Sequence, residues 1–191
     1  MTTSAHRIDP ESFDKVYRST TDPWNFESSW YELRKYQLSL AMLPNPHYRR
    51  CFEPGASIGV LSQALAPRCD QLVTIEASPT AVAVARQRLQ GIPHVEVRCG
   101  SVPEDWPDEE YDLIVLSEIG YYFDQESFAE IAKRCSSHFD SGGTVLAVHW
   151  LGKSPDHLRH GDEVHSDLLA TLGAPTASYS ETAFRAETWQ R

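Results

Sequence analysis

The chain has 191 residues, of which 41% are hydrophobic, and this length suits one domain with a sheet covered on both faces. Its formal net charge of −10, with the acids spread along the chain, argues against a nucleic-acid partner, because phosphates would be repelled. The sequence has no apolar run of about 18 residues and no apolar signal core after residues 1–7, which argues against membrane insertion and predicts a cytoplasmic protein.

The four cysteines lie far apart in the sequence, and no C-x-x-C pair occurs among them. Each falls inside or beside a predicted strand or helix. We therefore expect reduced, buried side chains that act as small apolar residues at Cys51, Cys69, Cys99 and Cys135.

Residues 1–50 are rich in aromatic side chains and predict two helices, over residues 12–17 and 30–43, with a turn at residues 22–24 between them. The second helix carries apolar residues at helical spacing, which favours an amphipathic helix packed on a sheet through Trp30, Leu33 and Leu38. The alternative is a lid that closes over a bound cofactor through Trp24, Tyr31 and Arg34.

A strand through Phe52 leads into the turn Glu53-Pro54-Gly55-Ala56-Ser57-Ile58-Gly59, which opens a helix. Its glycines let the backbone pass close under a ligand. The next strand, residues 71–75, ends at Glu76, where a nucleotide-binding sheet places the acceptor for ribose hydroxyls. The turn has two glycines where a pyrophosphate site uses three, and Glu53 would attract a sulfonium or ammonium group. These features predict an adenosine ligand without a pyrophosphate.

The remaining elements alternate between helix and strand. Helices are predicted over residues 78–89, 125–138 and 161–172, and strands over residues 94–99, 111–116, 144–150, 176–180 and 183–189. A turn at Gly142-Gly143 should precede the strand that begins at residue 144. Residues 151–160 form a polar insertion.

The E-P-G-x-x-x-G turn followed by Glu76 resembles the class I S-adenosylmethionine-dependent methyltransferases. Over residues 11–170 the chain is similar to the nodulation protein S (NodS)-like members, through Asp22-Pro23-Trp24, residues 29–36, residues 53–59, residues 116–122, His149-Trp150 and residues 161–165. The resemblance implies S-adenosylmethionine as cofactor and a Rossmann-like α/β fold with helices on both faces and an N-terminal helical lid. Its seven-stranded sheet would be mostly parallel, with the order 3-2-1-4-5-7-6 and the last strand antiparallel.

The resemblance also implies one methyltransferase domain over residues 1–191. It would comprise a helical cap (1–45), a cofactor-binding core (46–150), and an acceptor-side insertion with the closing strands (151–191). The cofactor site would be formed by Trp24, Tyr31, Arg34, Glu53, Gly55, Ala56, Ser57, Gly59, Glu76, Ala77, Ser101, Val102, Ser117, Glu118, Ile119 and Tyr122. Ser101 stands where relatives often have an acid beside the adenine ring.

The family's named members methylate the free amine of a deacetylated chitooligosaccharide, so the resemblance implies a small-molecule or oligosaccharide acceptor. An amine must lose a proton before it attacks, and the candidates for this base are Glu118, His149 and His165. Acceptor contacts are expected from Tyr121, His149, Trp150 and His165. Alternatively, Glu118 belongs to the cofactor shell, the histidines bond backbone carbonyls and Trp150 is a core residue.

His157, His160 and His165 raise a metal hypothesis, but they do not share one helical face, and we expect no metal site. The leading function is methylation of an amino-sugar amine. Alternatives are O- or N-methylation of another metabolite, and a cofactor-binding protein without catalysis. A nucleotide-dependent oxidoreductase ranks last because the third glycine is missing. The oligomeric state stays open, with a monomer favoured.

Overall fold

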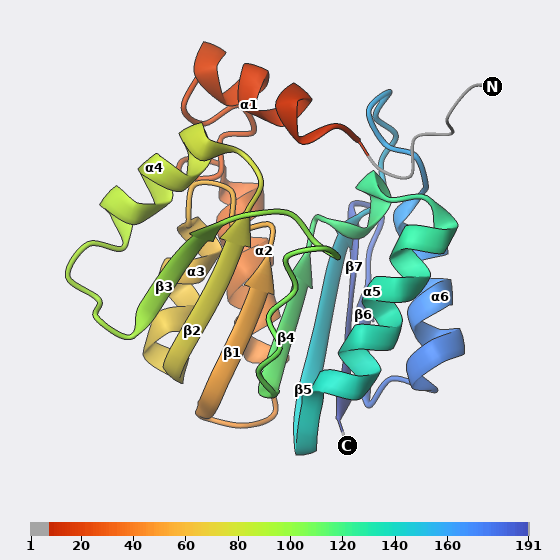
Figure 1. Ribbon diagram of the computed structural model, residues 1–191. Helices are drawn as coiled ribbons and strands as arrows, with labels where there is room; N and C mark the ends of the chain where they lie inside the picture. The colour runs from red at the N-terminus through yellow and green to blue at the C-terminus, as the bar shows by residue number, and fades with distance from the viewer. Residues whose placement is uncertain (1–7, 191) are drawn as a thin grey trace.

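A seven-stranded sheet runs through the centre of the molecule (Figure 1). The computed structural model describes residues 8–190, and for residues 138–142 the backbone alone. The sheet order is β3-β2-β1-β4-β5-β7-β6, with β1 (Tyr48–Pro54), β2 (Cys69–Glu76), β3 (Val95–Cys99), β4 (Tyr111–Ser117), β5 (Phe139–Trp150), β6 (Ala177–Ser180) and β7 (Phe184–Gln190). Strands β1 to β5 are parallel, whereas β7 is antiparallel to β5 and β6. The predicted fold class and strand order are confirmed.

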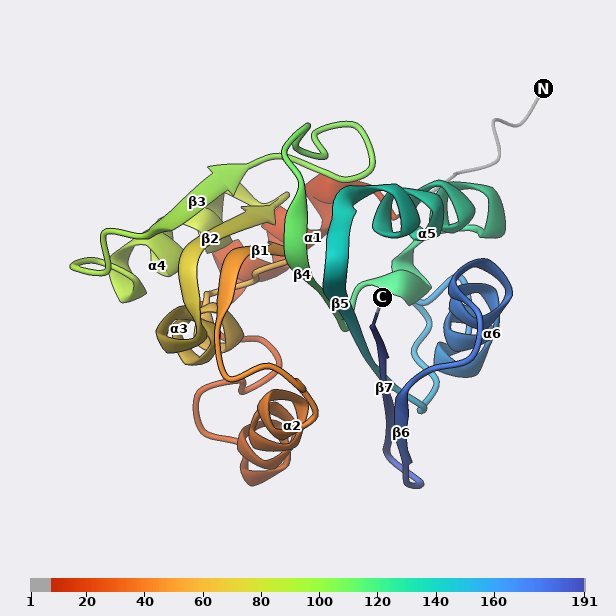
Figure 2. The ribbon, with the colours of Figure 1, turned by 90° about the horizontal axis from the view of Figure 1, so that it is seen from below.

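Helices cover both faces of this sheet (Figure 2). Helices α2 (Trp30–Ala41), α3 (Val60–Leu65) and α4 (Pro79–Arg88) lie on one face, and α5 (Gln125–His138) and α6 (Gly161–Leu172) lie on the other. Strand β4 is buried between them and alternates its apolar side chains. Leu113 and Val115 join the core under α2 and α3, while Ile114 and Leu116 join the core under α5 and α6. Two short 3-10 helices lie in the connections of residues 8–190, η1 (Ala66–Arg68) between α3 and β2 and η2 (Gly120–Tyr122) between β4 and α5.

Helix α1 (Pro10–Ser19) lies across the carboxyl ends of the parallel strands (Figure 1). Asp14 fixes it to the first turn of α4, because its Oδ1 accepts hydrogen bonds from Ser78 Oγ at 2.7 Å and from the Thr80 amide at 3.1 Å. Tyr17 adds a hydroxyl contact of 2.5 Å to Ser57 in the glycine turn. The N-terminal segment therefore covers the edge of the sheet where ligands of such folds bind.

The stripe predicted to pack α2 on the sheet is wrong at Trp30 and Leu33, whereas Leu38 does pack against the core. Trp30 is 70% exposed and Leu33 is 47% exposed, whereas the buried face of α2 carries Glu32, Lys35, Tyr36 and Ser39. Apolar spacing misled the prediction because the buried face of this helix is polar and meets a carboxylate from another element, described below. Long-range charge pairing of this kind leaves no period in the local sequence.

The expectation of four reduced, buried cysteines is also wrong. Cys51 and Cys69 form a disulfide with a Cα–Cα distance of 6.3 Å, and Cys99 is exposed. Only Cys135 is a free, buried thiol as expected. The cysteines lie on the neighbouring strands β1 and β2 but are not direct partners in the ladder, because Cys51 pairs with Leu72 and Cys69 pairs with Tyr48. A separation of 18 residues in the sequence does not reveal this contact.

The other boundaries agree with the predictions to within a few residues, with one exception at β5. The predicted turn at Gly142-Gly143 lies inside β5, which begins at Phe139. The ladder to β4 pairs Phe139 with Tyr111 and then Thr144 with Leu113, so the glycines occupy an irregular stretch of the strand.

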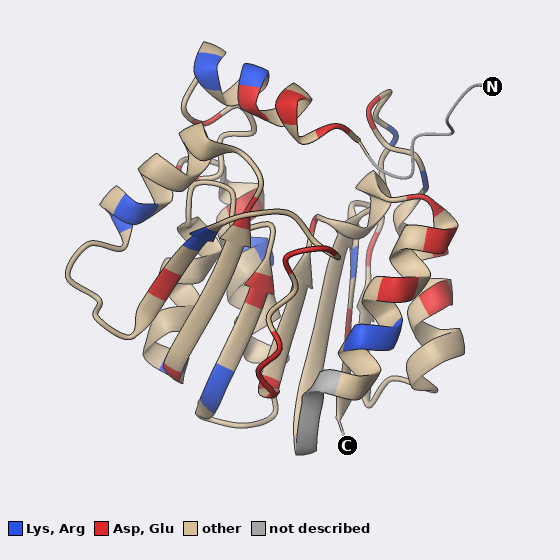
Figure 3. Ribbon diagram, in the orientation of Figure 1, with Lys and Arg blue, Asp and Glu red and all other residues tan. Residues whose placement is uncertain are grey.

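Acidic side chains are dispersed over the molecule (Figure 3). They occur on α1, α5 and α6 and in the loop between β3 and β4, which agrees with acids spread along the sequence. Across residues 8–190, every helix is too short or too polar to cross a bilayer. Residues 1–7, in which no signal segment was expected, lie outside the described residues.

Candidate active site

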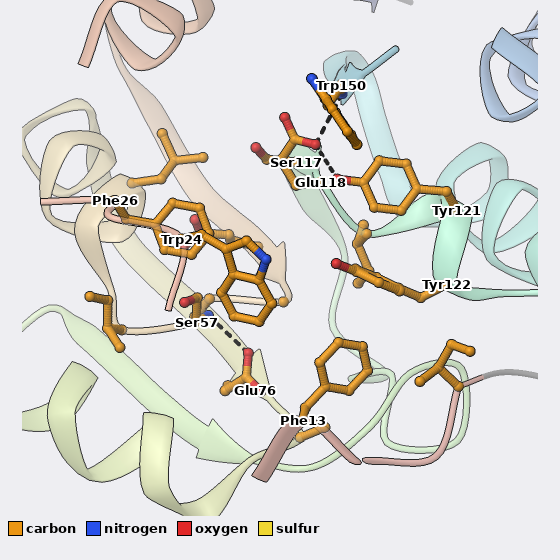
Figure 4. A pocket seen from close by; sticks show the side chains of 18 of the residues that line it. Phe13, Trp24, Phe26, Ser57, Glu76, Ser117, Glu118, Tyr121, Tyr122 and Trp150 are labelled. Carbon is orange, nitrogen blue, oxygen red and sulfur yellow. Dashed lines mark hydrogen bonds between the residues drawn. The ribbon is translucent and has the colours of Figure 1, made fainter. Parts of the chain in front are cut away.

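A cavity of about 390 Å³ opens at the carboxyl ends of β1, β2 and β4, beneath α1 (Figure 4). One end is formed by the glycine turn and the tip of β2, with Gly55, Ser57 and Glu76. We call this the glycine-turn end. The other end is formed by four side chains that we call the aromatic wall, namely Tyr121, Tyr122, Trp150 and His157. The two ends share one continuous space.

Gly55 and Gly59 both have positive φ angles, +80° and +79°, which favour glycine. Only Gly55 lines the cavity. A Cβ atom on Gly55 would lie 3.1 Å from Ile119 Cδ1, so the turn passes close under the loop that follows β4. A Cβ atom on Gly59 would lie 3.2 Å from Ala85 Cβ, so this glycine allows α3 to approach α4. Gly59, predicted as a cofactor contact, therefore acts through packing.

Glu76 shapes the glycine-turn end from the tip of β2. Its Oε2 accepts a hydrogen bond from the Ser57 amide at 2.9 Å, and its Oε1 accepts one from the Ser78 amide at 2.8 Å. Burial raises the pKa of this carboxyl, and the two amide bonds oppose that shift. Because each carboxylate oxygen can accept a second hydrogen bond, Glu76 still has sites for two vicinal hydroxyls. This arrangement of acceptors fits the hydroxyls of a ribose.

Glu53 lies beneath the same end of the cavity and is 2% exposed. Burial raises its pKa to about 7, and its Oε2 accepts a hydrogen bond of 2.5 Å from Ser62 Oγ. A cation bound nearby would stabilise the ionised form and lower this pKa. Such a group is suited to hold the positively charged part of a ligand.

The loop after β3 closes the glycine-turn end through Gly100, Ser101 and Val102, and Ala77 lines it from β2. Ser101 lines the cavity itself, whereas Asp105, four residues later, does not line it and contacts the backbone of the loop. Asp105 Oδ2 accepts a hydrogen bond of 2.8 Å from the Ser101 amide. This carboxylate therefore orders the loop, and a ring that enters here meets the predicted residues Ser101 and Val102.

Lys35 lies in the interior between two carboxylates that border the cavity. Its Nζ is 3.0 Å from Glu32 Oε1 and 2.6 Å from Glu118 Oε1, and the Lys35 side chain is 2% exposed. Burial lowers the pKa of Lys35, but the negative charges, that of Glu118 first, outweigh it and leave the pKa above its usual value. Tyr31 places its ring 5.0 Å from Nζ. Sequence reasoning missed Lys35 because Glu118 is distant in the chain.

Glu118 follows β4 with a φ of +56° and joins the two halves of the site. Besides Lys35, it accepts hydrogen bonds at Oε2 from the Tyr121 hydroxyl and from the Trp150 amide, the latter at 3.0 Å (Figure 4). Three donors therefore hold this carboxylate in place. It lines the cavity as predicted and orients two residues of the aromatic wall. Ser117, Ile119 and Tyr122 line the cavity beside it.

His149 and His165 do not lie on the cavity, contrary to the sequence-based expectation for a base and acceptor contact. Both are fully buried behind η2. His149 Nε2 accepts a hydrogen bond of 3.1 Å from the Gly120 amide, and its Nδ1 lies 3.2 Å from His165 Nε2. His165 Nδ1 lies 2.7 Å from Glu187 Oε2. With Nε2 of His149 as acceptor, its Nδ1–H donates to His165 Nε2, and Nδ1–H of His165 donates to Glu187.

Arg34, which was predicted to contact the cofactor, does not line the cavity either. Its guanidinium binds Glu181 through two hydrogen bonds of 2.9 and 2.8 Å and contacts the Tyr179 hydroxyl, so α2 is tied to the β6–β7 hairpin. Trp24 and Tyr31, the other two residues of the predicted lid, do line the cavity. Sequence reasoning missed Phe13 and Tyr17 from α1, which line it as well.

The histidines that suggested a metal lie in three different environments. His157 belongs to the aromatic wall, where its ring stacks on Tyr121 with a centroid distance of 3.8 Å and an interplanar angle of 16°. His160 caps α6 by accepting from the Asp162 amide. His165 belongs to the buried network. Their separation explains why the spacing in the sequence does not build a shared site.

Comparison with known proteins identifies the family. The model of the family "Nodulation protein S (NodS)" matches residues 13–139. Nodulation protein S of Rhizobium tropici is 29% identical over 102 residues, which are 53% of this chain and 43% of that protein. The matched part therefore spans less than half the length of that curated relative.

Many solved structures are similar to this one, and two of them are informative here. A protein from Pseudomonas syringae described as a candidate methyltransferase is 38% identical, with a TM-score of 0.76 over 85% of this chain and 100% of that chain. The N-methyltransferase NodS of Bradyrhizobium japonicum, in complex with S-adenosylhomocysteine, has a TM-score of 0.81 and 18% identity over 94% of this chain and 96% of that chain. This second likeness concerns the fold alone. Because the family model covers well over half of the 191 residues, the chain belongs to the nodulation protein S family of S-adenosylmethionine-dependent methyltransferases.

Proposed function

We propose that this enzyme methylates the free amine of a small acceptor that binds against the aromatic wall. The observation that carries the proposal is the single cavity that joins the glycine-turn end to the aromatic wall. A ligand held by Glu76 at one end can therefore meet an acceptor held beside Trp150 at the other. The acceptor class that relatives suggest is an amino sugar, free or within an oligosaccharide.

The residues at the glycine-turn end fit S-adenosylmethionine. Glu76 retains acceptor sites for ribose hydroxyls, Gly55 leaves room for backbone approach to the methionyl part, and Glu53 offers a buried negative charge. Bound there, the cofactor supplies a methyl group on a positively charged sulfur. The enzyme's main task is then to align a neutral nitrogen with that carbon and exclude water.

The aromatic wall suits an acceptor with one apolar face and one polar group. Trp150 and Tyr122 present ring faces or edges to the cavity, and aromatic rings of this kind pack against sugar or alkyl C–H groups. Asp156 and Ser154, from the loop after β5, add polar atoms on the same side. The family match ends at residue 139, so the acceptor loop lies beyond it and the acceptor need not be that of the named relatives.

The domain organisation that accompanies this proposal is a single unit with three parts. Residues 1–45 act as cap, residues 46–150 bind the cofactor, and residues 151–191 contribute the acceptor side and the closing strands. The oligomeric state proposed with this arrangement is a monomer. The proposed setting is the cytoplasm.

A screen for release of S-adenosylhomocysteine tests the proposal. The acceptors should include glucosamine, deacetylated chitooligosaccharides, alkylamines and matched compounds with a hydroxyl in place of the amine. We expect turnover with amines and little with their hydroxyl counterparts. Tight binding of S-adenosylhomocysteine without turnover of any compound would favour a non-catalytic cofactor-binding protein. Preference for the hydroxyl compounds would favour O-methylation.

A further inference from the structure

An amine acceptor is protonated at neutral pH, so the site must remove a proton before the nitrogen can attack. The carboxylates around the cavity are already engaged, and among them Glu32 pairs with Lys35 and Asp156 accepts a hydrogen bond from Ser154. Glu118 receives three hydrogen bonds, from Lys35, Tyr121 and Trp150. Glu76 holds two backbone amides, and Glu53 lies beneath the glycine turn with Ser62. His149 and His165 lie outside the cavity. The base must therefore be sought elsewhere.

His157 lies on the cavity surface within the aromatic wall. Its ring stacks on Tyr121 and meets Tyr122 and Trp150 edge to face, at centroid distances of 5.2 and 5.8 Å. The imidazole is thus held by three rings. Within residues 8–190, its ring nitrogens take part in no hydrogen bond to another side chain or to the backbone, so they are free to receive a proton.

We propose that His157 is the general base that deprotonates the acceptor amine, a role that rests on the proposed function. The proton passes from the acceptor nitrogen to an unprotonated ring nitrogen of His157. The nitrogen lone pair then forms a bond to the methyl carbon while the carbon–sulfur bond breaks and its electron pair remains on sulfur. The products are the methylated amine, S-adenosylhomocysteine and a protonated His157, which returns its proton to solvent.

The surroundings of His157 favour a neutral ring at pH 7. Burial lowers its pKa, and this outweighs the opposing charges of Asp156 on its own loop and Glu118 after β4. His160 from the same loop lowers the pKa further. Tyr121 and Tyr122, which pack on it from η2, are neutral because burial raises their own pKa values. His149, which faces Tyr121 from β5, is held neutral by burial. Above its lowered pKa, His157 is ready to accept a proton.

Two substitutions separate proton transfer from packing. His157→Phe keeps an aromatic ring against Tyr121, and His157→Asn keeps a polar group of similar size. If His157 is the base, both should lower kcat by roughly 10²–10⁴-fold near neutral pH, and the rising limb of the kcat pH profile that remains should follow the pKa of the acceptor amine. Affinity for S-adenosylhomocysteine, measured by calorimetry, should stay within about twofold. The control is His47→Asn, since His47 is exposed and pairs with Asp70 at 2.8 Å away from the cavity.

A second readout does not depend on turnover. In the complex with S-adenosylhomocysteine, the NMR signals of the His157 ring, identified by their loss in His157→Asn, should titrate below pH 6.5 and shift when glucosamine is added. Wild-type activity in His157→Phe would show that the ring contributes only packing, and it would overturn the role of His157 as general base. A His157 ring that does not respond to the amine would also overturn it, even if no acceptor were turned over. Absence of turnover in the wild type together with a responsive ring would count against the proposed function instead.

Discussion

Among the charged residues, Lys35 is the one whose loss should lower the stability of the fold most, because it neutralises two carboxylates in the interior. We predict that Lys35→Met lowers the free energy of unfolding by about 3–5 kcal/mol, since Glu32 and Glu118 would be left without a countercharge. Urea denaturation measures this change. Lys15→Met is the matched control, because Lys15 and its partner Glu11 are both exposed and such pairs contribute less than about 1 kcal/mol. Equal effects of the two substitutions would contradict the buried cluster.

Glu76 is the residue on which cofactor affinity should depend most directly. We predict that Glu76→Ala weakens binding of S-adenosylhomocysteine by about 1–3 kcal/mol, because the ribose hydroxyls lose a charged acceptor. Calorimetry measures the affinity, and circular dichroism checks that loss of the Ser57 and Ser78 contacts leaves the fold intact. Glu96→Ala, on the exposed edge strand β3, serves as control. Unchanged affinity in Glu76→Ala would remove this residue from the ribose site.

For single residues, the sequence was most informative at the glycine-turn end, because a turn, a strand tip and a helix cap are all local patterns. Side chains that meet from distant parts of the chain leave no local pattern of this kind. Lys35 and Glu118 are 83 positions apart, and nothing near Lys35 reveals its burial. The misplacement of His149 was avoidable, however. Side chains alternate along a strand, so Trp150 and His149 at the end of β5 must face opposite sides, and only one of them can reach the cavity.

Helix α1 is attached to the core through hydrogen bonds of Asp14 and Tyr17, and we propose that it acts as a lid that opens and closes over the cavity. We predict that Asp14→Ala speeds amide hydrogen exchange across α1 and weakens binding of S-adenosylhomocysteine, because α1 loses its bonds to Ser78 and Thr80. In the wild type, binding should slow exchange in the same residues. Glu11→Gln, on the exposed side of α1, is the control. Protection confined to the sheet would mean that α1 does not respond to the ligand.

The network that links η2, β5, α6 and β7 through His149 should make stability depend on pH. Burial, followed by the charge of His165, holds the pKa of His149 well below its usual value. Below about pH 6.5 the unfolded chain binds a proton at this position and the native protein does not, so the free energy of unfolding falls as the pH falls, by up to about 1.4 kcal/mol per pH unit. Glu53, whose pKa is raised to about 7, changes stability in the opposite direction.

Comparison of variants isolates the histidine from that opposing group. Denaturation of wild type and His149→Gln between pH 5.5 and 7.5 should show a smaller loss of stability towards acid in the variant. His47→Gln should keep the wild-type slope, because His47 is exposed. An unchanged slope in His149→Gln would mean that His149 is protonated in the native protein.

The disulfide between Cys51 and Cys69 should stabilise the whole fold, because it restricts the conformations that the unfolded chain can adopt. For a closed loop of 18 residues, loop-closure entropy predicts a contribution of about 3 kcal/mol to the free energy of unfolding. Urea denaturation with and without dithiothreitol should show this difference in the wild type and not in Cys51→Ala. Cofactor affinity should change little, since both cysteines lie away from the cavity. An unchanged midpoint under reductant would show that the bond adds no stability.

The overall topology could be predicted because strand lengths, connection lengths and the glycine turn together are typical of one plan. The strand order itself came from the resemblance, because the sequences of β5 and β7 do not indicate that these two strands pair. The disulfide was missed for the same physical reason. Both depend on how neighbouring strands are aligned in the sheet, and hydrophobic periodicity reports only which face a residue occupies.

The two ends of the cavity come from separate stretches of the chain, with consequences for how such enzymes diverge. Glycine-turn residues lie between positions 53 and 102, whereas the aromatic wall draws on residues 121–122 and on the loop from residue 150 to 157. Substitutions or insertions in that loop can alter which nucleophile is presented to the methyl group without disturbing the contacts that hold the donor. Exchange of this one segment between relatives is therefore a direct route to enzymes that keep their donor and acquire new acceptors.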